Sequence, residues 1–168
     1  MSIESIGVIG AGQMGNGIAQ VAACAGFNVT IVDIKQEYLD KALSNIQQSL
    51  DKLVSKGRLE EVDAKVAFSL INCDTEMKSV SDADLIIEAV PEILNLKNSI
   101  FSTLDSLCKS STIFASNTSS ISIDKIANST NRPELVIGMH FMNPVPLMKL
   151  VEIINGNQTS PEVNSLVV

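Results

Sequence analysis

His140 is the one histidine of this 168-residue chain, and it stands in the segment GMHFMNPVPLMKLVE, residues 138–152. Imidazole has an intrinsic pKa of about 6.5, so it is suited to accept or donate a proton near neutral pH. The other interpretation is a histidine at the end of a strand whose ring is bonded to a backbone carbonyl. The residue types alone admit both interpretations.

Glu152 is the candidate partner of this histidine. Pro144 and Pro146 lack backbone donors, so the Asn-Pro-Val-Pro segment is expected to turn the chain rather than to continue a strand. The pattern of Leu150–Ile154 predicts a strand that runs back, which would bring Glu152 beside His140. A carboxylate there would orient the ring and stabilise its protonated form. The alternative is a solvent-facing strand residue, and the alternation of the segment fits both.

A second chemical signal is the hexapeptide GAGQMG, in which Gly10, Gly12 and Gly15 have the spacing G-x-G-x-x-G. Gly10 would make a tight turn, Gly12 would let the backbone approach a pyrophosphate, and Gly15 would let the following helix pack closely against a strand. The N-terminus of that helix would present free N–H groups to phosphates. The motif predicts a dinucleotide site, with a structural glycine-rich turn as the alternative.

Asp33 supports the dinucleotide interpretation. It ends the next apolar run, eighteen residues after Gly15. A carboxylate at this place accepts hydrogen bonds from the ribose hydroxyls of an adenosine and repels a 2′-phosphate. Asp33 therefore favours NAD over NADP, although Lys35, two residues further on, weakens this preference.

A third group of polar side chains lies on a predicted helix, Gln36–Lys56. Its apolar face consists of Leu39, Leu43, Ile46, Leu50 and Leu53. Ser49, Lys52 and Lys56 lie on a separate ridge. The ordinary interpretation is a solvated face with cations near the C-terminus of the helix, where the helix dipole favours them. The alternative is a patch that binds the phosphates of an anionic ligand.

The composition excludes several classes of function. The formal net charge of −7 argues against a nucleic-acid partner and against attraction to anionic membranes. Cys24, Cys73 and Cys108 are widely separated and odd in number, so we expect reduced thiols in a cytoplasmic protein and no metal site. Glu4 and the absence of Lys or Arg before Lys35 argue against a secretory signal. No uninterrupted apolar run is long enough to predict a membrane span.

Apolar runs and helical patterns alternate along the chain. The predicted strands are Ile6–Ile9, Val29–Val32, Leu70–Cys73, Leu85–Val90, Ile113–Ala115 and Val136–Met139, and the predicted helices are Met14–Ala25, Gln36–Lys56, Ile93–Cys108 and Ile121–Ala127. This order predicts an α/β, Rossmann-like, doubly wound fold: a mostly parallel sheet with helices on both faces and a final antiparallel strand. His140 would then follow the sixth strand, at the carboxyl edge where open parallel sheets bind ligands.

We expect one domain, residues 1–168, because this length suits one substantial core and is too short for two. Near the end, Ser160 as N-cap and Pro161 at the first helical position predict a helix that stops after two turns. That abrupt stop indicates a missing continuation.

Four motifs together resemble a known family: GAGQMG with Asp33, IIEAVPE (86–92), ASNTSS (115–120) and GMHFMNPVPLMKLVE. They are similar to the NAD-binding domain of the 3-hydroxyacyl-CoA dehydrogenases, of the bacterial 3-hydroxybutyryl-CoA dehydrogenase type. The first motif is shared with many dehydrogenases, whereas the last is far more specific. The resemblance covers nearly the whole chain. It implies that full-length members are homo-oligomers with a further helical domain, absent here, that supplies most of the dimer contact and closes the substrate cleft.

The resemblance also implies catalytic roles. His140 is the expected base and Glu152 its partner, Ser119 resembles the serine that contacts both substrate and nicotinamide, and Asn143 resembles the asparagine that helps to hold the reacting group. Without the family, Ser119 is equally well explained as an N-cap of the helix Ile121–Ala127. Asn143 before a proline is otherwise an ordinary turn residue.

Ligand contacts are implied in the same way. Glu92 and Lys97 match positions that contact the ribose on the nicotinamide side, with a surface ion pair as the alternative. The other expected cofactor contacts are Gly10, Gly12, Gln13, Met14, Gly15, Asp33, Asn117 and Ser119. Ser49 and Lys56 match contacts to coenzyme A, and Lys52 is their neighbour on the helix by geometry only.

The implied function is reversible, NAD-linked oxidation of an (S)-3-hydroxyacyl-CoA, 3-hydroxybutyryl-CoA in particular, to the 3-ketoacyl-CoA, with NADP as the alternative cofactor. A different class of function is an isolated NAD-binding module that does not turn over because the closing domain is missing. A third is a dehydrogenase of free hydroxy acids on the same sheet. Binding of coenzyme A would disfavour the third.

Overall fold

Apolar side chains project from both faces of the central strands, so the sheet has to be covered on both sides. The structure is a computed structural model that describes residues 2–168. Its strands are β1 (Ser5–Ile9), β2 (Asn28–Val32), β3 (Ile71–Asp74), β4 (Leu85–Glu88), β5 (Ile113–Ser116), β6 (Val136–Phe141) and β7 (Val151–Asn155). Its helices are α1 (Gln13–Cys24), α2 (Gln36–Ser55), α3 (Glu61–Ser69), α4 (Leu94–Leu107), α5 (Ile123–Ala127) and α6 (Pro161–Val167), with short 3-10 helices at Met77–Val80 and Pro133–Leu135.

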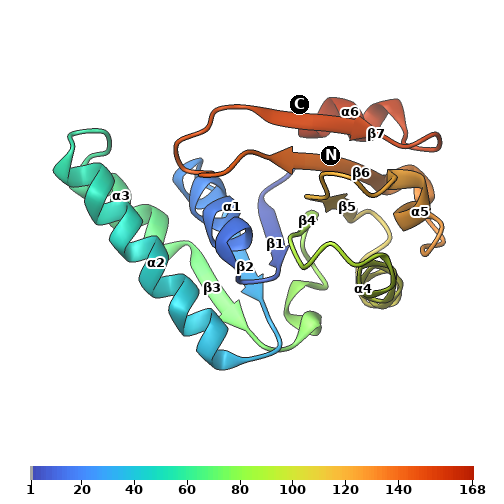
Figure 1. Cartoon of the computed structure of the whole chain (residues 1–168), viewed down its shortest axis with the longest axis horizontal. Helices are drawn as coiled ribbons and strands as arrows, with labels where there is room; N and C mark the ends of the chain where they lie inside the picture. Colours follow the sequence, from blue (N-terminus) through green and yellow to red (C-terminus); the bar gives the residue numbers. More distant parts are fainter. Residues whose placement is uncertain (1) are drawn as a thin grey trace.

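The sheet has the strand order β3-β2-β1-β4-β5-β6-β7. Every neighbouring pair is parallel except β6 and β7, which are antiparallel, so the predicted fold class is confirmed. The chain moves outward from β1 to β3 and then returns to place β4 on the other side of β1 (Figure 1). This reversal of strand order leaves a crevice beyond the carboxyl ends of β1 and β4, where open α/β sheets bind ligands.

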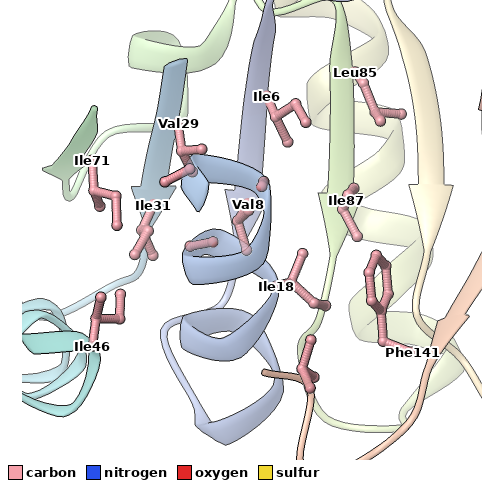
Figure 2. Packing of buried hydrophobic residues seen from close by; sticks show 14 of the residues in the cluster. Ile6, Val8, Ile18, Val29, Ile31, Ile46, Ile71, Leu85, Ile87 and Phe141 are labelled. Carbon is pink, nitrogen blue, oxygen red and sulfur yellow. The ribbon is translucent and has the colours of Figure 1, made fainter. Parts of the chain in front are cut away.

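Two separate apolar clusters form the core, one on each face of the sheet. Side chains on one face of the strands pack with α1, α2 and α3, and Figure 2 shows Ile18 of α1 beside Val8 and Ile87. The other cluster packs against α4 and α5 and contains the edge-to-face pair Phe101 and Phe114, whose ring centroids are 6.0 Å apart. Helices on both faces are the consequence of strands that are apolar on both faces.

The register of the strands places side chains in rows across one face. Glu88 of β4 lies opposite Ser116 of β5, which lies opposite Gly138 of β6. Two residues further along β6, His140 lies opposite Glu152 of β7. Because side chains two residues apart in a strand share a face, both rows belong to the face covered by α4 and α5. A Cβ atom at Gly138 would indeed lie 2.9 Å from a side chain of α5.

The structure corrects the predicted elements in three places. β6 extends to Phe141, so His140 lies within the strand rather than after it, because pairing with β7 continues the ladder beyond its last bond with β5. β4 ends at Glu88 rather than Val90, because the Val90 N–H bonds to the Glu88 carboxylate instead of a neighbouring strand. α3 was not predicted. The remaining strands and helices agree to within two residues, including α6 with Ser160 accepting a bond from the Val163 N–H at its start.

Candidate functional site

His140 and Glu152 form a hydrogen-bonded pair on neighbouring strands. The Nδ1 atom of His140 lies 2.8 Å from Oε2 of Glu152. Directly opposite residues in an antiparallel ladder project to the same side, which explains how two residues twelve positions apart meet. The side chains are 24% and 53% exposed, so a ligand can reach the pair. With Nδ1 bonded to the carboxylate rather than to a backbone carbonyl, Nε2 is the nitrogen that remains for a ligand.

The glycine loop lies between β1 and α1, at the point where the strand order reverses. Gly10 has a φ of +104°, a conformation that side-chain-bearing residues rarely adopt. A Cβ atom at Gly15 would collide with the carbonyl oxygen of Gly10, so the helix can approach the strand only with a glycine there. Gly12 is different, because a Cβ atom there would have no protein atom within 4 Å. The packing of the protein therefore does not require glycine at residue 12. Close approach of a ligand to the backbone of residue 12 would require it.

Asp33 holds the glycine loop in place. Its Oδ2 atom accepts a hydrogen bond of 2.7 Å from the backbone N–H of Ala11, and its Oδ1 atom accepts one of 2.7 Å from Ile34. Each oxygen of a carboxylate can accept a second bond, so the side chain can still bind hydroxyl groups. Asp33 thus lies where the dinucleotide interpretation requires a carboxylate, and it also fixes the loop from the neighbouring strand.

A cavity of about 920 Å³ extends from the glycine loop across the carboxyl ends of β1, β2 and β4. The polar and charged side chains that line it come from the first turn of α1, the end of β2, α2 and the loop after β3: Gln13, Asn16, Asp33, Tyr38, Lys41, Asn45 and Thr75. Apolar side chains such as Val90, Leu96 and Ile100 form the opposite wall. Met14 does not line the cavity and packs against the core instead.

The segment after β6 reaches back to the glycine loop. The amide of Gln13 donates a hydrogen bond of 3.2 Å to Oδ1 of Asn143, and the Asn143–Pro144 peptide bond is cis. The hydrogen bond between Gln13 and Asn143 joins residues that are 130 positions apart in the chain. Asn143 is therefore more than a turn residue, because it connects the predicted pyrophosphate loop to the strand that carries His140.

The loop after β5 lies beside β6. The amide oxygen of Asn117 accepts a hydrogen bond of 2.8 Å from the backbone N–H of Phe141, next to His140. Ser119 is exposed in this loop. The proposed N-cap role of Ser119 is wrong, because α5 begins at Ile123 with Ser122 as its N-cap. Ser119 thus lies in the loop beside β6, the strand that carries His140, and does not cap α5.

Lys97 and Glu92 do form an ion pair, but it is not the surface pair that was the alternative for them, because Lys97 is buried. Lys97 is 1% exposed, and its ammonium group lies 2.7 Å from Glu88 and 3.4 Å from Glu92. Burial alone would raise the pKa of Glu92, but the Thr118 hydroxyl and the Lys97 charge outweigh it and lower that pKa. Glu88 is 0% exposed and also accepts a 2.6 Å bond from Ser116. We refer to Glu88, Glu92, Lys97, Ser116 and Thr118 as the Glu88 network.

The sequence analysis did not identify Glu88 as a site residue, although Glu88 lies in the motif IIEAVPE. The signal was a lone carboxylate at the end of a strongly apolar strand, followed nine residues later by a lysine on the next helix. A buried carboxylate requires a partner of this kind.

The ridge on α2 continues the polar lining of the cavity. Tyr38, Lys41 and Asn45 line the cavity, and Ser49, Lys52 and Lys56 follow them at spacings of three or four residues. Such spacing places all six side chains along one side of a helix. Ser49 is half-buried. Lys52 and Lys56 are exposed, so the positive charges of these two lysines face solvent beyond the cavity.

Residues 2–168 contain no group of three or more His, Cys, Asp or Glu side chains arranged to hold a metal ion. In the same range, no helix has both the length and the apolar character needed to cross a bilayer.

The reversal of strand order, the open glycine loop and the carboxylate after β2 define a dinucleotide-binding domain of the dehydrogenase class. The sequence matches the model of one family, described as 3-hydroxyacyl-CoA dehydrogenase, NAD binding domain, over residues 5–168. The chain belongs to this family.

Several relatives have names that agree with the family. The chain is 50% identical over 161 residues to a probable 3-hydroxybutyryl-CoA dehydrogenase of Deinococcus radiodurans, and that match covers 96% of the chain and 58% of the relative. It is 48% identical over 162 residues to a protein of the same name in Bacillus subtilis, covering 96% of the chain and 56% of the relative. The chain thus spans little more than half the length of these two relatives.

Solved structures agree in fold. The crystal structure of (S)-3-hydroxybutyryl-CoA dehydrogenase from Ralstonia eutropha matches with a TM-score of 0.96 at 44% identity, over 99% of this chain and 59% of that one. A prephenate dehydrogenase from A. aeolicus matches with a TM-score of 0.65 at 14% identity and shares the fold alone.

Proposed function

We propose that this protein takes part in reversible, NAD-linked oxidation of an (S)-3-hydroxyacyl-CoA to the 3-ketoacyl-CoA. The observation that carries the proposal is the His140–Glu152 pair, with 2.8 Å between Nδ1 and Oε2, at the carboxyl edge of the sheet that carries the glycine loop. Family membership supports the reaction class, and 3-hydroxybutyryl-CoA is the proposed substrate because the relatives with that name are about 50% identical.

The residues around the cavity fit a bound NAD. The open space at Gly12 admits a pyrophosphate against the backbone, and the carboxylate of Asp33 suits ribose hydroxyls while it disfavours a 2′-phosphate. The proposed contacts on the adenosine and pyrophosphate side are Gly10, Gly12, Gln13, Met14, Gly15 and Asp33. Those on the nicotinamide side are Glu92, Asn117 and Ser119, which lie outside the lining of this cavity. Lys97 belongs to the same expected set, but its side chain is 1% exposed and is bonded to Glu88 and Glu92, so it would act on the ligand through Glu92.

In this proposal His140 manages the proton of the reaction. A bound NAD would supply the acceptor for the hydride that leaves the alcohol carbon. The Glu152 carboxylate accepts a bond from Nδ1–H, which leaves the lone pair of Nε2 to take the hydroxyl proton of the substrate. In the reductive direction His140 returns that proton to the forming alkoxide. Glu152 orients the ring and stabilises its charged form, in the manner of a carboxylate behind a catalytic imidazole.

Ser119 and Asn143 are the proposed partners of the reacting oxygen. Ser119 is exposed in the loop beside β6, and Asn143 follows β6 itself. Because the Gln13 amide already bonds to Oδ1 of Asn143, the NH₂ group of Asn143 remains to donate to a substrate oxygen.

Coenzyme A is proposed to bind along the α2 ridge. A protein with a formal net charge of −7 needs a local cationic patch to hold phosphates, and Lys52 and Lys56 supply one beside Ser49. Changing both lysines to Gln should raise the dissociation constant for coenzyme A, measured by titration calorimetry, by about tenfold. The substitutions should also make the affinity for coenzyme A less dependent on salt concentration. The matched control is Lys65→Gln on α3, an exposed lysine that lies outside the ridge. Equal weakening by the control would contradict the ridge as the binding site.

The central experiment compares His140→Gln with the unmodified chain. We expect the variant to lose reduction of acetoacetyl-CoA by NADH while its NADH affinity, measured by fluorescence, stays within about twofold. Gln keeps a polar side chain of similar reach but cannot exchange a proton near neutral pH. Loss of both turnover and NADH binding would mean that His140 is structural and would contradict the proposed role.

The second candidate function is an NAD-binding module without turnover. The two relatives described above extend beyond the part that this chain matches, which is 58% and 56% of their length. NADH binding without reduction of acetoacetyl-CoA by the unmodified chain would support this candidate. Turnover by the chain alone would exclude it.

We also propose a cytoplasmic location. Its support is that Cys24, Cys73 and Cys108 are all free thiols in the structure, as expected in a reducing compartment. Cell fractionation of the native protein tests this proposal, and recovery outside the cytoplasmic fraction would contradict it.

A further inference from the structure

Glu88 is a buried carboxylate at the carboxyl end of β4, behind the wall of the cavity. Its side chain is 0% exposed, and that of its partner Lys97 on α4 is 1% exposed. Burying such a pair gains little over apolar side chains of the same size, because the loss of hydration offsets the attraction between the charges. The attraction within the pair therefore does not by itself explain why charged residues lie here, and the groups that Glu88 and Lys97 bond to have to be considered.

The pair holds both backbone groups of Val90, which lines the cavity. The N–H of Val90 donates to Oε1 of Glu88 at 2.7 Å, and the Val90 carbonyl accepts from the Lys97 ammonium at 3.4 Å. The preceding residue, Ala89, donates to β1 at 2.8 Å, and its carbonyl oxygen would lie 2.7 Å from a Cβ atom at Gly10. The turn after β4 is thus fixed against the glycine loop.

The other oxygen of Glu88 holds the loop after β5. The Ser116 hydroxyl donates to Oε2 of Glu88 at 2.6 Å, and the Thr118 N–H donates to the Ser116 hydroxyl at 3.3 Å. All three groups are buried. One carboxylate therefore ties together two loops that follow neighbouring strands.

Glu92 closes the network from the exposed side. Its Oε2 atom lies 3.4 Å from the Lys97 ammonium, and its Oε1 atom accepts bonds from the hydroxyls of Thr118 and Ser120. The hydroxyl groups of Ser116, Thr118 and Ser120 therefore all bond to carboxylates of the Glu88 network. Ser119 lies between two residues held in this way, and Asn117 bonds to β6.

The network lies one row behind the candidate catalytic row. Glu88, Ser116 and Gly138 are neighbours in register, and His140 is two residues beyond Gly138 on the same face. Two residues along a strand correspond to about 7 Å. Glu88 is 0% exposed, so it is too deeply buried to touch a ligand, but it bonds directly to the two loops that carry groups that would.

We propose that Glu88 is a positioning residue for the dinucleotide site: its negative charge holds Lys97, and through Lys97, Val90 and Ser116 it fixes the two loops that border the nicotinamide half of the ligand. This inference rests on the proposed function. The carboxylate acts on loop geometry and makes no contact with ligand.

The test is Glu88→Gln, compared with the unmodified chain by NADH fluorescence titration and thermal unfolding. Glutamine keeps the shape and can still accept the Val90 bond, but it leaves Lys97 without its nearest negative charge. We expect the dissociation constant for NADH to rise about tenfold at a temperature where both proteins are fully folded. An NADH affinity unchanged from the unmodified chain would overturn the proposal.

Asp105→Asn is the matched control. Asp105 lies on α4, eight residues after Lys97, and its carboxylate lies 2.6 Å from Arg132, with the two side chains 7% and 15% exposed. We expect a loss of thermal stability with NADH affinity within about twofold of the unmodified chain. If the two variants weaken NADH binding equally, the role of Glu88 is only structural and the proposal fails.

Ser116→Ala keeps the inference testable if Glu88→Gln does not fold. It removes one link to the second loop and leaves the ion pair intact, so we expect a smaller rise of about threefold in the NADH dissociation constant. No rise would overturn the proposal. If the unmodified chain itself fails to bind NADH, the proposed function fails with it, whereas binding that is insensitive to both substitutions contradicts the positioning role alone.

Discussion

Gly17 of α1 lies directly against Val145 of the Asn-Pro-Val-Pro segment: a Cβ atom at Gly17 would be 2.8 Å from Cβ of Val145. No side-chain rotation relieves a contact between two Cβ atoms, so one backbone would have to move. Gly17, the second glycine of α1, thus sets how closely the segment after β6 approaches this helix.

Gly17→Ala is therefore expected to be destabilising. In an exposed helix this change would stabilise the protein by about 1 kcal/mol, but overpacking a buried contact costs about 1–3 kcal/mol. We expect a net loss of about 1 kcal/mol in the free energy of unfolding in urea. The displaced segment carries Asn143, so turnover, where present, should fall as well. A variant more stable than the unmodified chain would show that the contact relaxes without cost.

Gly12→Ala should have the opposite profile. Residue 12 has φ −66° and ψ −171°, which any residue adopts, and a Cβ atom there would meet no protein atom within 4 Å. We expect the free energy of unfolding to stay within about 0.5 kcal/mol of that of the unmodified chain. The added methyl group would occupy the space proposed for the pyrophosphate, so the NADH dissociation constant should rise at least about tenfold. Unchanged NADH affinity would place the pyrophosphate elsewhere.

Acid should destabilise the protein partly through Asp84. The Lys109 ammonium, 2.6 Å away, lowers the pKa of Asp84 below its ordinary value, and bonds from Glu4 and Ser5 add to this effect against the cost of burial. A depressed folded-state pKa contributes stability that is present above the unfolded value of about 4 and is lost as the pH falls toward the folded value.

Asp84→Asn should therefore cost about 1–2 kcal/mol at pH 7 and reduce the loss of stability below about pH 4, as measured by urea unfolding across that range. Glu61→Gln is the control, because the Glu61–Lys65 pair is exposed and contributes little. A variant at residue 84 whose pH dependence equals that of the unmodified chain would contradict the assignment.

The three thiols should differ in reactivity. Burial raises the pKa of Cys73 to about 11, with the Asp40 charge adding to it, and burial raises the pKa of Cys108 to about 11. At pH 8 only about a thousandth of each would be thiolate, the reactive form. Burial also raises the pKa of Cys24, but Cys24 is the exposed thiol of the three, so it should react first with a disulfide reagent, and Cys24→Ser should remove the fast phase. A fast phase that survives this substitution would contradict the order.

The sequence by itself determined the features that depend on local spacing. The strands and helices follow from apolar periodicity, the glycine loop from three glycines within six residues, and the start of α6 from Ser160 and Pro161. Even the meeting of His140 and Glu152 was predictable, because two prolines between two apolar runs require a reversal of the chain. Each of these inferences uses residues within about twenty positions of one another.

Only the tertiary structure decided which distant groups meet. Gln13 and Asn143 are 130 positions apart, and Ser116 reaches Glu88 across 28 positions, so neither contact has a local pattern in the sequence. The burial of Lys97 also depends on how α4 lies on the sheet. The physical reason is that strand order and register decide which side chains share a row, and a buried charge is tolerated only where that row supplies its partner.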